Sequence, residues 1–417
     1  MAQPQGIHAR KAALRLLDAV LRRGETLDVA FGAATSDVRK FEDKALARAI
    51  AGEVLRWLVD LDAAIDSATK QKLPDDAKVR TVLRMMLAQW LRLDTPPHAV
   101  IATGLPLLAG GPRRLAHGVF STLTKREIAL PDAPTLPAEV AARWGNRASA
   151  IAAGLAEPPP LDLTLRDPAE TEVWKAKLAA DSLMPGHLRL PRGENVEKLA
   201  GFADGAWWVQ DLAASIPARL LGAGEGRHSL DLCAAPGGKT LQLAAQGWKV
   251  TALDISKRRL DLLKANLKRT GLAAGTVRAD ALTWEPKHQF DAILLDAPCT
   301  ATGTARRHPD VLHRIGQRQI EEMAELQAAL LERAQGWLKP GGMLVYATCS
   351  LARAEGEAQV AAFLETTPDA ARAPVTAAEA GGEEFLTRAG DYRSRPDHWP
   401  NSGGIDGLFA ARLTRRA

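Results

Sequence analysis

Four short apolar runs, each followed by a segment with helical character, constrain the fold of this chain most strongly. They cover residues 230–233, 250–254, 292–296 and 343–347. Nearly continuous apolar strands that alternate with amphipathic helices are typical of a parallel sheet buried between helices. A further strand is expected from Gly404 to Leu413, and the Ala, Pro, Gly and Glu-rich stretch 368–384 is expected to form a flexible surface insertion. The C-terminal half is therefore predicted to be an α/β domain of the Rossmann type.

The N-terminal part of the chain has a different periodicity. Its apolar residues recur at helical spacing, for example at Leu46, Ile50, Val54 and Leu58. Proline and glycine clusters separate these segments, because both residues interrupt helical hydrogen bonding. We predict three regions, which are an all-helical domain over 1–135, a small mixed α+β segment over 136–225 and the Rossmann-type domain over 226–417.

Composition excludes several classes of protein. No stretch approaches the roughly 20 apolar residues that a membrane-spanning helix requires, and the first residues lack the apolar core and cleavage site of a signal peptide. We therefore expect a cytoplasmic protein with no membrane contact. The three cysteines cannot all pair within one chain, and no Cys/His cluster has the spacing of zinc ligands, so we expect free thiols and no metal.

The charge is uneven along the chain. The whole sequence carries a formal net charge of +5, and residues 1–135 alone hold 20 Lys and Arg against 15 Asp and Glu. This asymmetry favours a polyanionic partner, but it is equally typical of ordinary surface charge.

The residues at the predicted strand ends indicate a cofactor. The first strand runs into the small-residue loop 233–239, which has neither the Walker spacing nor the Gly-x-Gly-x-x-Gly pattern. Asp254, Asp280 and Asp296 end the next three strands, where carboxylates can accept hydrogen bonds from ribose hydroxyls. A single Asp at such a place is more often a helix cap or turn former. The series as a whole favours S-adenosylmethionine, a cationic nucleoside without phosphate, and therefore a methyltransferase.

Two cysteines at strand ends indicate the kind of methyl transfer. Cys299 lies in Asp-Ala-Pro-Cys and Cys349 in Ala-Thr-Cys-Ser. Carbon 5 of a pyrimidine becomes nucleophilic once a thiolate adds to carbon 6, and a base must later remove the proton from carbon 5. An isolated cysteine at a strand end is more often a buried, inert residue, and we assign that role to Cys233. Because Cys299 and Cys349 are expected at the same edge of the sheet, we favour a catalytic role for both.

Together these motifs resemble the Sun family of RNA cytosine-5 methyltransferases. The resemblance rests on Ala-Ala-Pro-Gly-Gly-Lys-Thr at 234–240, Asp-Ala-Pro-Cys-Thr-Ala-Thr-Gly at 296–303 and Tyr-Ala-Thr-Cys-Ser at 346–350. It extends over nearly the whole chain, because the helical leader resembles a NusB-like RNA-binding domain. The run Arg-Arg-His-Pro-Asp at 306–310 resembles the bacterial members that act on small-subunit ribosomal RNA.

The resemblance implies roles for particular residues. Cys349 would be the nucleophile and Cys299 would assist breakdown of the covalent adduct, as the base or through a base that it positions. Asp296 would bind the methyl donor and also hydrogen-bond the cytosine ring. The other residues implied in binding the methyl donor are Cys233, Ala234, Ala235, Pro236, Gly237, Gly238, Lys239, Asp254 and Asp280.

The expected partner is 16S ribosomal RNA, free or at an early stage of assembly, with no obligatory protein partner evident. Arg306, Arg307 and His308 are candidates for binding its phosphates, although a solvated loop is an equally good interpretation. Two alternatives stay open, which are a tRNA cytosine-5 methyltransferase and a non-catalytic NusB-like RNA-binding assembly factor. Two departures from the family pattern, at 355–357 and 406–409, are expected to lie away from the chemistry.

Overall fold

The computed structural model describes residues 6–416, which form two compact units. Unit 1 contains the described residues up to Pro158 together with the later segment Ala305–Ile315, and unit 2 contains Pro159–Thr304 and the chain from Gly316 onward. The segment predicted over 136–225 is divided between them, because its first two helices belong to unit 1 and its strands to unit 2. The range predicted as one Rossmann-type domain contributes Ala305–Ile315 to unit 1.

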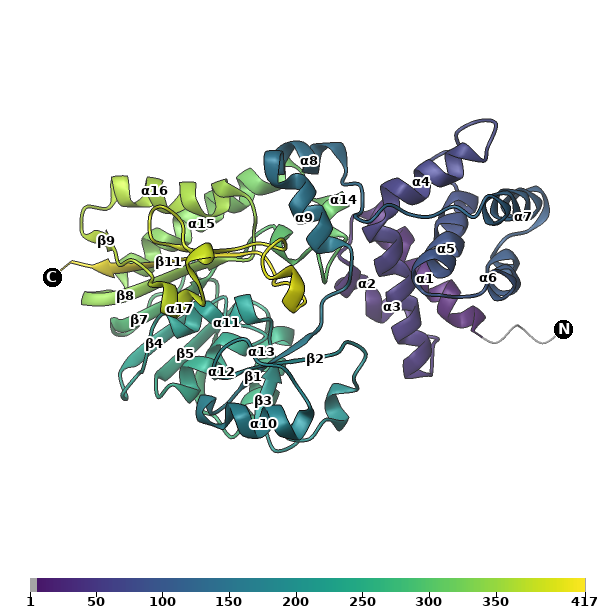
Figure 1. The fold of residues 1–417 in the computed structure, drawn as a ribbon. Helices are drawn as coiled ribbons and strands as arrows, with labels where there is room; N and C mark the ends of the chain where they lie inside the picture. Colours follow the sequence, from purple (N-terminus) through teal and green to yellow (C-terminus); the bar gives the residue numbers. More distant parts are fainter. Residues whose placement is uncertain (1–5, 417) are drawn as a thin grey trace. The chain divides into compact units, whose positions relative to one another are not determined.

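Unit 1 is entirely helical in the described residues, as predicted (Figure 1). Its α-helices are α1 (Ile7–Arg23), α2 (Leu27–Ala34), α3 (Phe41–Arg56), α4 (Leu58–Ser67), α5 (Lys78–Arg92), α6 (Pro97–Gly104), α7 (Gly110–Lys125), α8 (Ala138–Trp144), α9 (Ala148–Leu155) and α14 (Val311–Arg314). The 3-10 turns η1 (Leu105–Leu107) and η2 (Gly145–Arg147) connect some of them.

Helix α1 shows why this part of the sequence folds as it does. Its buried residues include Ala13, Leu16, Leu17 and Val20, which lie on one face at helical spacing. The helix ends at Gly24, which has a φ of 69° and whose amide bonds back to the carbonyls of the last turn. The apolar face of α1 is part of the core that the helices of unit 1 share.

The segment Ala305–Ile315 is held in unit 1 by buried polar contacts. The guanidinium of Arg56 donates to the carbonyl oxygens of Leu155 at 2.6 Å and Arg306 at 2.9 Å. The Nε2 atom of His313, in α14, lies 2.6 Å from the carbonyl oxygen of Leu55. The chain that leaves unit 2 after Thr304 is thus fixed to the end of α3 before it returns.

Unit 2 contains two sheets. The small sheet has the order β2-β1-β3 and is antiparallel, whereas the large sheet has the order β10-β11-β8-β7-β4-β5-β6, with β9 pairing to β11. The strands are β1 (Leu161–Leu165), β2 (His187–Leu190), β3 (Trp207–Val209), β4 (His228–Leu232), β5 (Lys249–Asp254), β6 (Ala274–Arg278), β7 (Phe290–Asp296), β8 (Leu338–Thr348), β9 (Ala370–Arg372), β10 (Tyr392–Ser394) and β11 (Leu408–Arg415). The predicted Rossmann-type sheet is confirmed.

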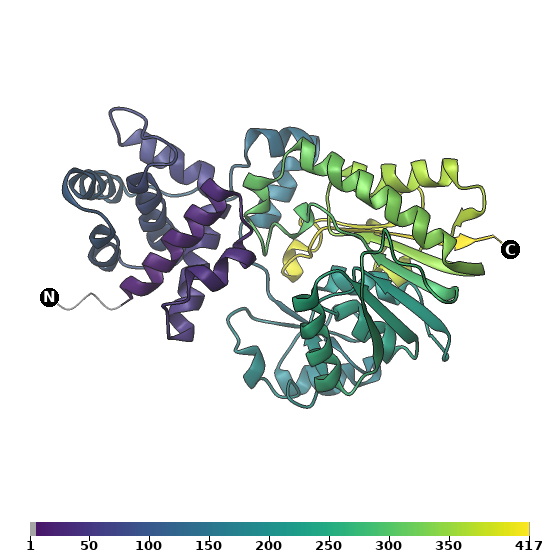
Figure 2. The same cartoon turned by 180° about the vertical axis from the view of Figure 1, so that it is seen from behind.

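Helices cover both faces of the large sheet, as Figures 1 and 2 show. They are α11 (Leu212–Arg219), α12 (Gly238–Ala245), α13 (Lys257–Thr270), α15 (Gln317–Gly336), α16 (Glu357–Thr366) and α17 (Ala377–Ala380), whereas α10 (Thr171–Leu178) packs on the small sheet. The 3-10 turns are η3 (Pro168–Glu170), η4 (Val196–Lys198), η5 (Thr302–Thr304), η6 (Arg353–Glu355), η7 (Glu383–Phe385) and η8 (Pro400–Ser402).

Strand β7 shows why an apolar run becomes a central strand. Ile293 and Leu295 belong to the core on the side of α15 and α16, whereas Ala292 and Leu294 belong to the core on the side of α11. Alternate side chains of a strand point to opposite faces, so a strand covered on both faces must be apolar at every position.

One sequence expectation in this unit is wrong. The stretch 368–384 is not a flexible insertion, because it contains β9 and α17, and Val375 and Ala380 are buried in the core. Small residues in this stretch pack closely, which composition alone does not distinguish from flexibility. The expected last strand is confirmed as β11, which pairs antiparallel to β8.

Within residues 6–416, no helix is both long and apolar enough to cross a membrane.

Candidate active site

The candidate site lies at the edge of the large sheet where its parallel strands end. Strand β4 pairs in parallel with β5 and β7, and β7 pairs in parallel with β8. The carboxyl ends of parallel strands meet at one edge, where open α/β sheets bind ligands. The topology therefore brings the loop after β4, Asp254, Asp296 and the two cysteine loops to a common edge, as the sequence predicts.

Asp254 holds the small-residue loop in place. Its side chain is buried, and its two carboxylate oxygens accept one backbone hydrogen bond each, from Ala235 N at 3.1 Å and Ser256 N at 2.8 Å. In the loop, Gly237 has a φ of 112°, and a Cβ there would lie 2.8 Å from Leu263 Cγ. Only glycine suits that position, because it adopts positive φ without strain and leaves room for the neighbouring helix.

Asp280 occupies a more open place than Asp254. It lies two residues beyond β6 and is exposed, and its Oδ1 accepts a hydrogen bond from Leu282 N at 2.9 Å. Ile255 follows Asp254 and is 64% exposed, and Leu282 is 37% exposed. These strand ends thus combine carboxylates with uncovered aliphatic side chains.

The chemistry of this donor set fits a cationic nucleoside. Each carboxylate oxygen of Asp254 takes one backbone donor, although an oxygen of this kind can accept two hydrogen bonds, so acceptor capacity for ribose hydroxyls is left. Uncovered aliphatic side chains beside the carboxylates suit the flat face of a purine. These residues therefore fit the predicted methyl donor.

The two predicted catalytic cysteines lie together. Cys299 follows β7 and Cys349 follows β8, and their Sγ atoms are 3.3 Å apart. The pKa of Cys299 is raised well above its ordinary value by the hydrogen bond with Cys349, by burial and by the charges of Cys349 and Glu355. The raised pKa keeps Cys299 a protonated thiol beside Cys349.

A partly buried ion pair lies at the same edge. Lys239 Nζ is 2.7 Å from Asp296 Oδ2. Burial acts to lower the pKa of Lys239, but the Asp296 carboxylate and the charges of Cys349 and Asp231 outweigh it and hold the pKa above its ordinary value. Lys239, which the sequence assigns to the methyl donor, therefore pairs with Asp296 as a permanent cation.

Burial raises the pKa of two further groups in this region. Burial, reinforced by the charges of Asp296, Asp254 and Asp231, raises the pKa of Cys233 to about 12. This keeps Cys233 a protonated thiol, in line with its expected role as a loop-lining residue. Burial also raises the pKa of Asp231 to about 7, against the effect of its hydrogen bond from Thr240.

Sequence reasoning missed a group of polar residues that joins the two cysteine loops. The carboxylate of Glu355, which is fully buried, accepts hydrogen bonds from Thr300 N at 2.9 Å and from Ser350 Oγ at 2.6 Å. Gly407 N donates to Gly303 O at 2.8 Å. Glu355 and Gly407 thus contact the loop that carries Cys299, and each lies next to a residue that departs from the family pattern, Gly356 or Leu408. That the departures themselves lie away from the chemistry stays a prediction. No pattern in the sequence marks these contacts.

The predicted phosphate-binding residues belong to unit 1. Arg306 is 4% exposed. His308 Nδ1 lies 3.4 Å from Asp28 Oδ2, and burial lowers the pKa of His308 although the charge of Asp28 acts to raise it. Arg307 is half-buried. Burial of Arg306 leaves it little surface for a phosphate, and an RNA-binding role for the three residues stays a prediction.

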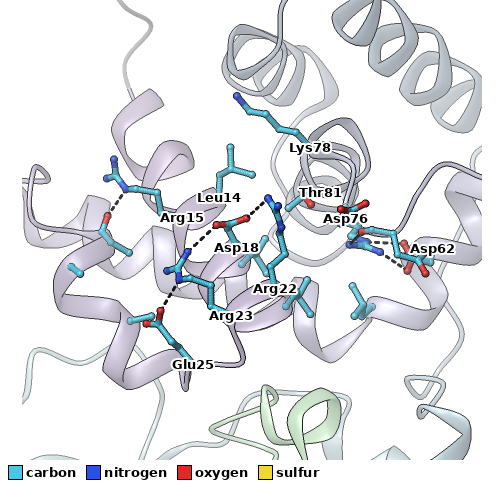
Figure 3. A pocket seen from close by; sticks show the side chains of 18 residues that line it. Leu14, Arg15, Asp18, Arg22, Arg23, Glu25, Asp62, Asp76, Lys78 and Thr81 are labelled. Atoms are coloured by element: carbon cyan, nitrogen blue, oxygen red, sulfur yellow. Dashed lines mark hydrogen bonds and ion pairs between the residues drawn. The ribbon is translucent and has the colours of Figure 1, made fainter.

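Unit 1 also contains a pocket of about 680 Å³ between its helices (Figure 3). Its apolar floor includes Leu14 and Leu17, and its rim is charged. The lining contains five Lys or Arg and five Asp or Glu side chains, and several of them pair with one another, as Arg84 does with Asp62. Because these charges balance, the pocket shows no electrostatic preference for a polyanion. No cluster of metal-ligating side chains is found within residues 6–416.

Comparisons with known proteins identify the family. Residues 218–414 match the family model described as 16S rRNA methyltransferase RsmB/F, and residues 7–107 match the NusB family. The proteins named ribosomal RNA small subunit methyltransferase B from Xanthomonas campestris pv. campestris and Salmonella arizonae are each 34% identical to this chain, and each alignment covers 98% of both chains.

Solved structures show the same fold. The crystal structure of PH0851 has a TM-score of 0.74 at 22% identity and covers 99% of both chains. NSun6 from Pyrococcus horikoshii has a TM-score of 0.58 at 21% identity and covers 67% of this chain and 98% of its own. The predicted resemblance to the Sun family is thus confirmed, and the chain belongs to the RsmB/F family of 16S rRNA methyltransferases.

Proposed function

We propose that this chain transfers a methyl group from S-adenosylmethionine to carbon 5 of a cytosine in 16S ribosomal RNA, through a covalent bond between Cys349 and carbon 6. The observation that carries the proposal is the pair of thiols, 3.3 Å apart, at the edge that also holds the Lys239–Asp296 ion pair. Methylation of an oxygen or nitrogen atom requires no such pair of thiols. A non-catalytic RNA-binding factor would need neither the thiols nor this ion pair.

The reaction requires a bond to carbon 6 before methyl transfer. The sulfur of Cys349 adds to carbon 6, and the electron pair of the carbon 5–carbon 6 bond moves to carbon 5. S-adenosylmethionine supplies the electrophilic methyl group that carbon 5 takes up. The remainder of the donor leaves as S-adenosylhomocysteine. A base then takes the proton from carbon 5, a role that we give to Cys299 or to a base that it positions. The electron pair of the carbon 5–hydrogen bond restores the double bond, the carbon–sulfur bond breaks, and Cys349 is released as a thiolate.

Asp296 and Lys239 orient the base in this proposal. The exocyclic amine of cytosine is a hydrogen-bond donor, and a carboxylate can accept from it. Asp296 Oδ2 accepts a hydrogen bond from the Lys239 ammonium, and we propose that Asp296 Oδ1 accepts one from the cytosine amine. The raised pKa of Lys239 keeps its ammonium charged, so that it can hold the Asp296 carboxylate in place.

The names of the curated relatives support ribosomal RNA as the substrate, and we extend this to an RNA that is protein-free or at an early stage of assembly. A stacked or paired cytosine must leave its stack to reach Cys349, which costs a few kcal/mol, and the cost is smaller in RNA that is not yet folded. We place the enzyme in the cytoplasm, where bacterial ribosomal RNA is assembled.

The test is a trapped adduct. Purified wild-type, Cys299→Ala and Cys349→Ala proteins are incubated with methyl donor and RNA, and denaturing gels and mass spectrometry detect protein bound to RNA. We expect an adduct to accumulate with Cys299→Ala and none to form with Cys349→Ala. Cys233→Ala is the matched control for a third thiol and is expected to accumulate no adduct, because the pKa of Cys233 keeps it protonated.

The same assay identifies the substrate. Protein-free 16S transcript, mature small subunits and tRNA are compared, and the modified nucleotide is mapped from the adduct. Methylation by Cys349→Ala protein would overturn the covalent assignment, and an adduct only with tRNA would overturn the ribosomal substrate. Equal rates on mature subunits and free transcript would refute the preference for unassembled RNA.

A further inference from the structure

Glu355 joins the two loops that carry the cysteines. Thr300, directly after Cys299, donates both its backbone N–H, at 2.9 Å, and its hydroxyl to the Glu355 carboxylate. Ser350, directly after Cys349, donates its hydroxyl to Glu355 Oε1 at 2.6 Å. One carboxylate therefore holds the residue that follows each thiol.

Glu355 is itself fixed by the scaffold of unit 2. Gln327, on α15, donates to Glu355 Oε2 at 3.1 Å and to Pro298 O at 2.8 Å. The carbonyl oxygen of Glu355 accepts from Tyr346 OH at 2.8 Å and from Thr348 Oγ1 at 3.1 Å. Glu355 is thus anchored to α15 through its carboxylate and to β8 through its backbone carbonyl. The two cysteine loops that it binds are therefore held in place relative to these two elements.

The burial of Glu355 makes this arrangement hard to explain as ordinary packing. Its side chain has no exposed surface. An ionised carboxylate in the interior is costly unless hydrogen bonds satisfy its oxygens, and here four donors do so. Three of the four come from the residues adjacent to the thiols. The hydrogen bonds of this buried carboxylate therefore act on the geometry of the two cysteine loops.

We propose that Glu355 is a positioning residue that sets the separation of the Cys299 and Cys349 sulfur atoms. The consequence for catalysis rests on the proposed function, but the consequence for sulfur geometry does not. Glu355 has no hydrogen bond to either sulfur atom, and it acts on the two loops through Thr300 and Ser350. Its loss should let the two loops separate.

The test uses the isosteric variant Glu355→Gln in the full chain. An amide offers one acceptor oxygen and two N–H donors, so one oxygen that accepts hydrogen bonds in the wild type becomes a donor. The first measurement requires neither RNA nor methyl donor. Diamide takes two electrons and two protons from the two thiols, and the rate of formation of the Cys299–Cys349 disulfide is followed by mass spectrometry of the cross-linked peptide.

The second measurement is methyl transfer, with kcat and KM for RNA determined separately. A misplacement of about 1 Å at reacting groups costs about 10²-fold in rate. We expect Glu355→Gln to lower kcat by about this factor, to leave KM for RNA unchanged and to slow disulfide formation. The matched control is Asp162→Asn, which removes another fully buried carboxylate of unit 2 and is expected to leave the rate of disulfide formation unchanged. All proteins are compared at a temperature at which near-UV circular dichroism shows them folded.

The outcomes separate this proposal from the proposed function. A normal rate of disulfide formation in Glu355→Gln would overturn the positioning role, even if turnover fell. Slower disulfide formation, with no adduct or methyl transfer by any protein, would sustain the positioning role and refute the proposed function. If Glu355→Gln does not fold, the rate of disulfide formation is measured in Thr300→Val instead. It removes only the hydroxyl donor, and an unchanged disulfide rate in that variant would overturn the proposal.

Discussion

A methyl group added at Gly303 should force the two cysteine loops apart. Gly303 N donates to Cys349 O at 2.9 Å, and Gly303 O accepts from Gly407 N at 2.8 Å. A Cβ at position 303 would lie 2.1 Å from Gly407 O and 2.9 Å from Cys349 O. Both are backbone atoms, so no side-chain rotation relieves the clash. Ordinary contact begins at 3.4 Å, so Gly303 must move by about 1.3 Å from Gly407 O and by about 0.5 Å from Cys349 O.

The expected cost of Gly303→Ala follows from this displacement. Overpacking of a well-packed region costs about 1–3 kcal/mol in the free energy of unfolding. A displacement of about 1 Å at reacting groups costs about 10²-fold in rate, so we expect kcat for methyl transfer to fall by about that factor. The disulfide assay with diamide should also slow, because Gly303 is in the loop that carries Cys299.

The assay compares Gly303→Ala with a matched glycine. Gly336 ends α15, and a Cβ there would meet no atom within 4 Å. Gly336→Ala should leave kcat unchanged and stabilise the protein by up to about 1 kcal/mol, because alanine is the better helix former. Stability is measured by urea unfolding and activity by transfer of a labelled methyl group. A Gly303→Ala protein with wild-type stability and wild-type kcat would refute the reasoning.

Two buried carboxylates should give opposite dependences of stability on pH. Burial raises the pKa of Asp231 from 3.8 to about 7, so the folded state binds the proton more tightly than the unfolded state, and up to about 4 kcal/mol should be lost as pH rises from about 4 to above 7. Asp231→Asn should abolish this loss in urea unfolding, and an unchanged pH slope would contradict it. Burial acts to raise the pKa of Asp162, but hydrogen bonds from Arg189 and His187 outweigh it and hold the pKa below its ordinary value. Asp162→Asn should therefore cost about 3–5 kcal/mol near pH 7, because the buried guanidinium of Arg189 loses its counter-charge, and the difference from wild type should shrink as pH falls below about 4. A difference that stays constant down to pH 2.5 would count against this account.

The part of the fold that sequence predicts well is the large sheet. Each of the four apolar runs is a strand, because a strand covered on both faces must be apolar at successive positions, and this leaves a local signal. Asp254 and Asp296 end their strands as predicted. The shared edge follows from parallel pairing, so the meeting of the two cysteine loops also follows from the sequence.

What the sequence does not predict depends on contacts between distant residues. Glu355 and Thr300 are 55 positions apart, and each is polar and lies outside any periodic pattern. A polar residue in a loop is solvated in most proteins, so its burial here is visible only once α15 and both loops are placed. The same is true of Ala305–Ile315, whose sequence does not show that it packs in unit 1 rather than beside the sheet.

The proposed order of events is consistent with the unequal state of the two thiols. The hydrogen bond with Cys349 is the largest cause of the raised pKa of Cys299, and the charge of Cys349 adds to it. A sulfur that is bonded to carbon 6 carries no charge, so Cys349 no longer raises the pKa of Cys299 through its charge in the adduct. Cys299 is therefore held as a thiol before the attack, and the pKa of Cys299 should fall when the adduct forms. A group that becomes more acidic only in the adduct suits a role in breakdown of the adduct, and it explains why Cys299→Ala should stall the reaction after the attack and not before it.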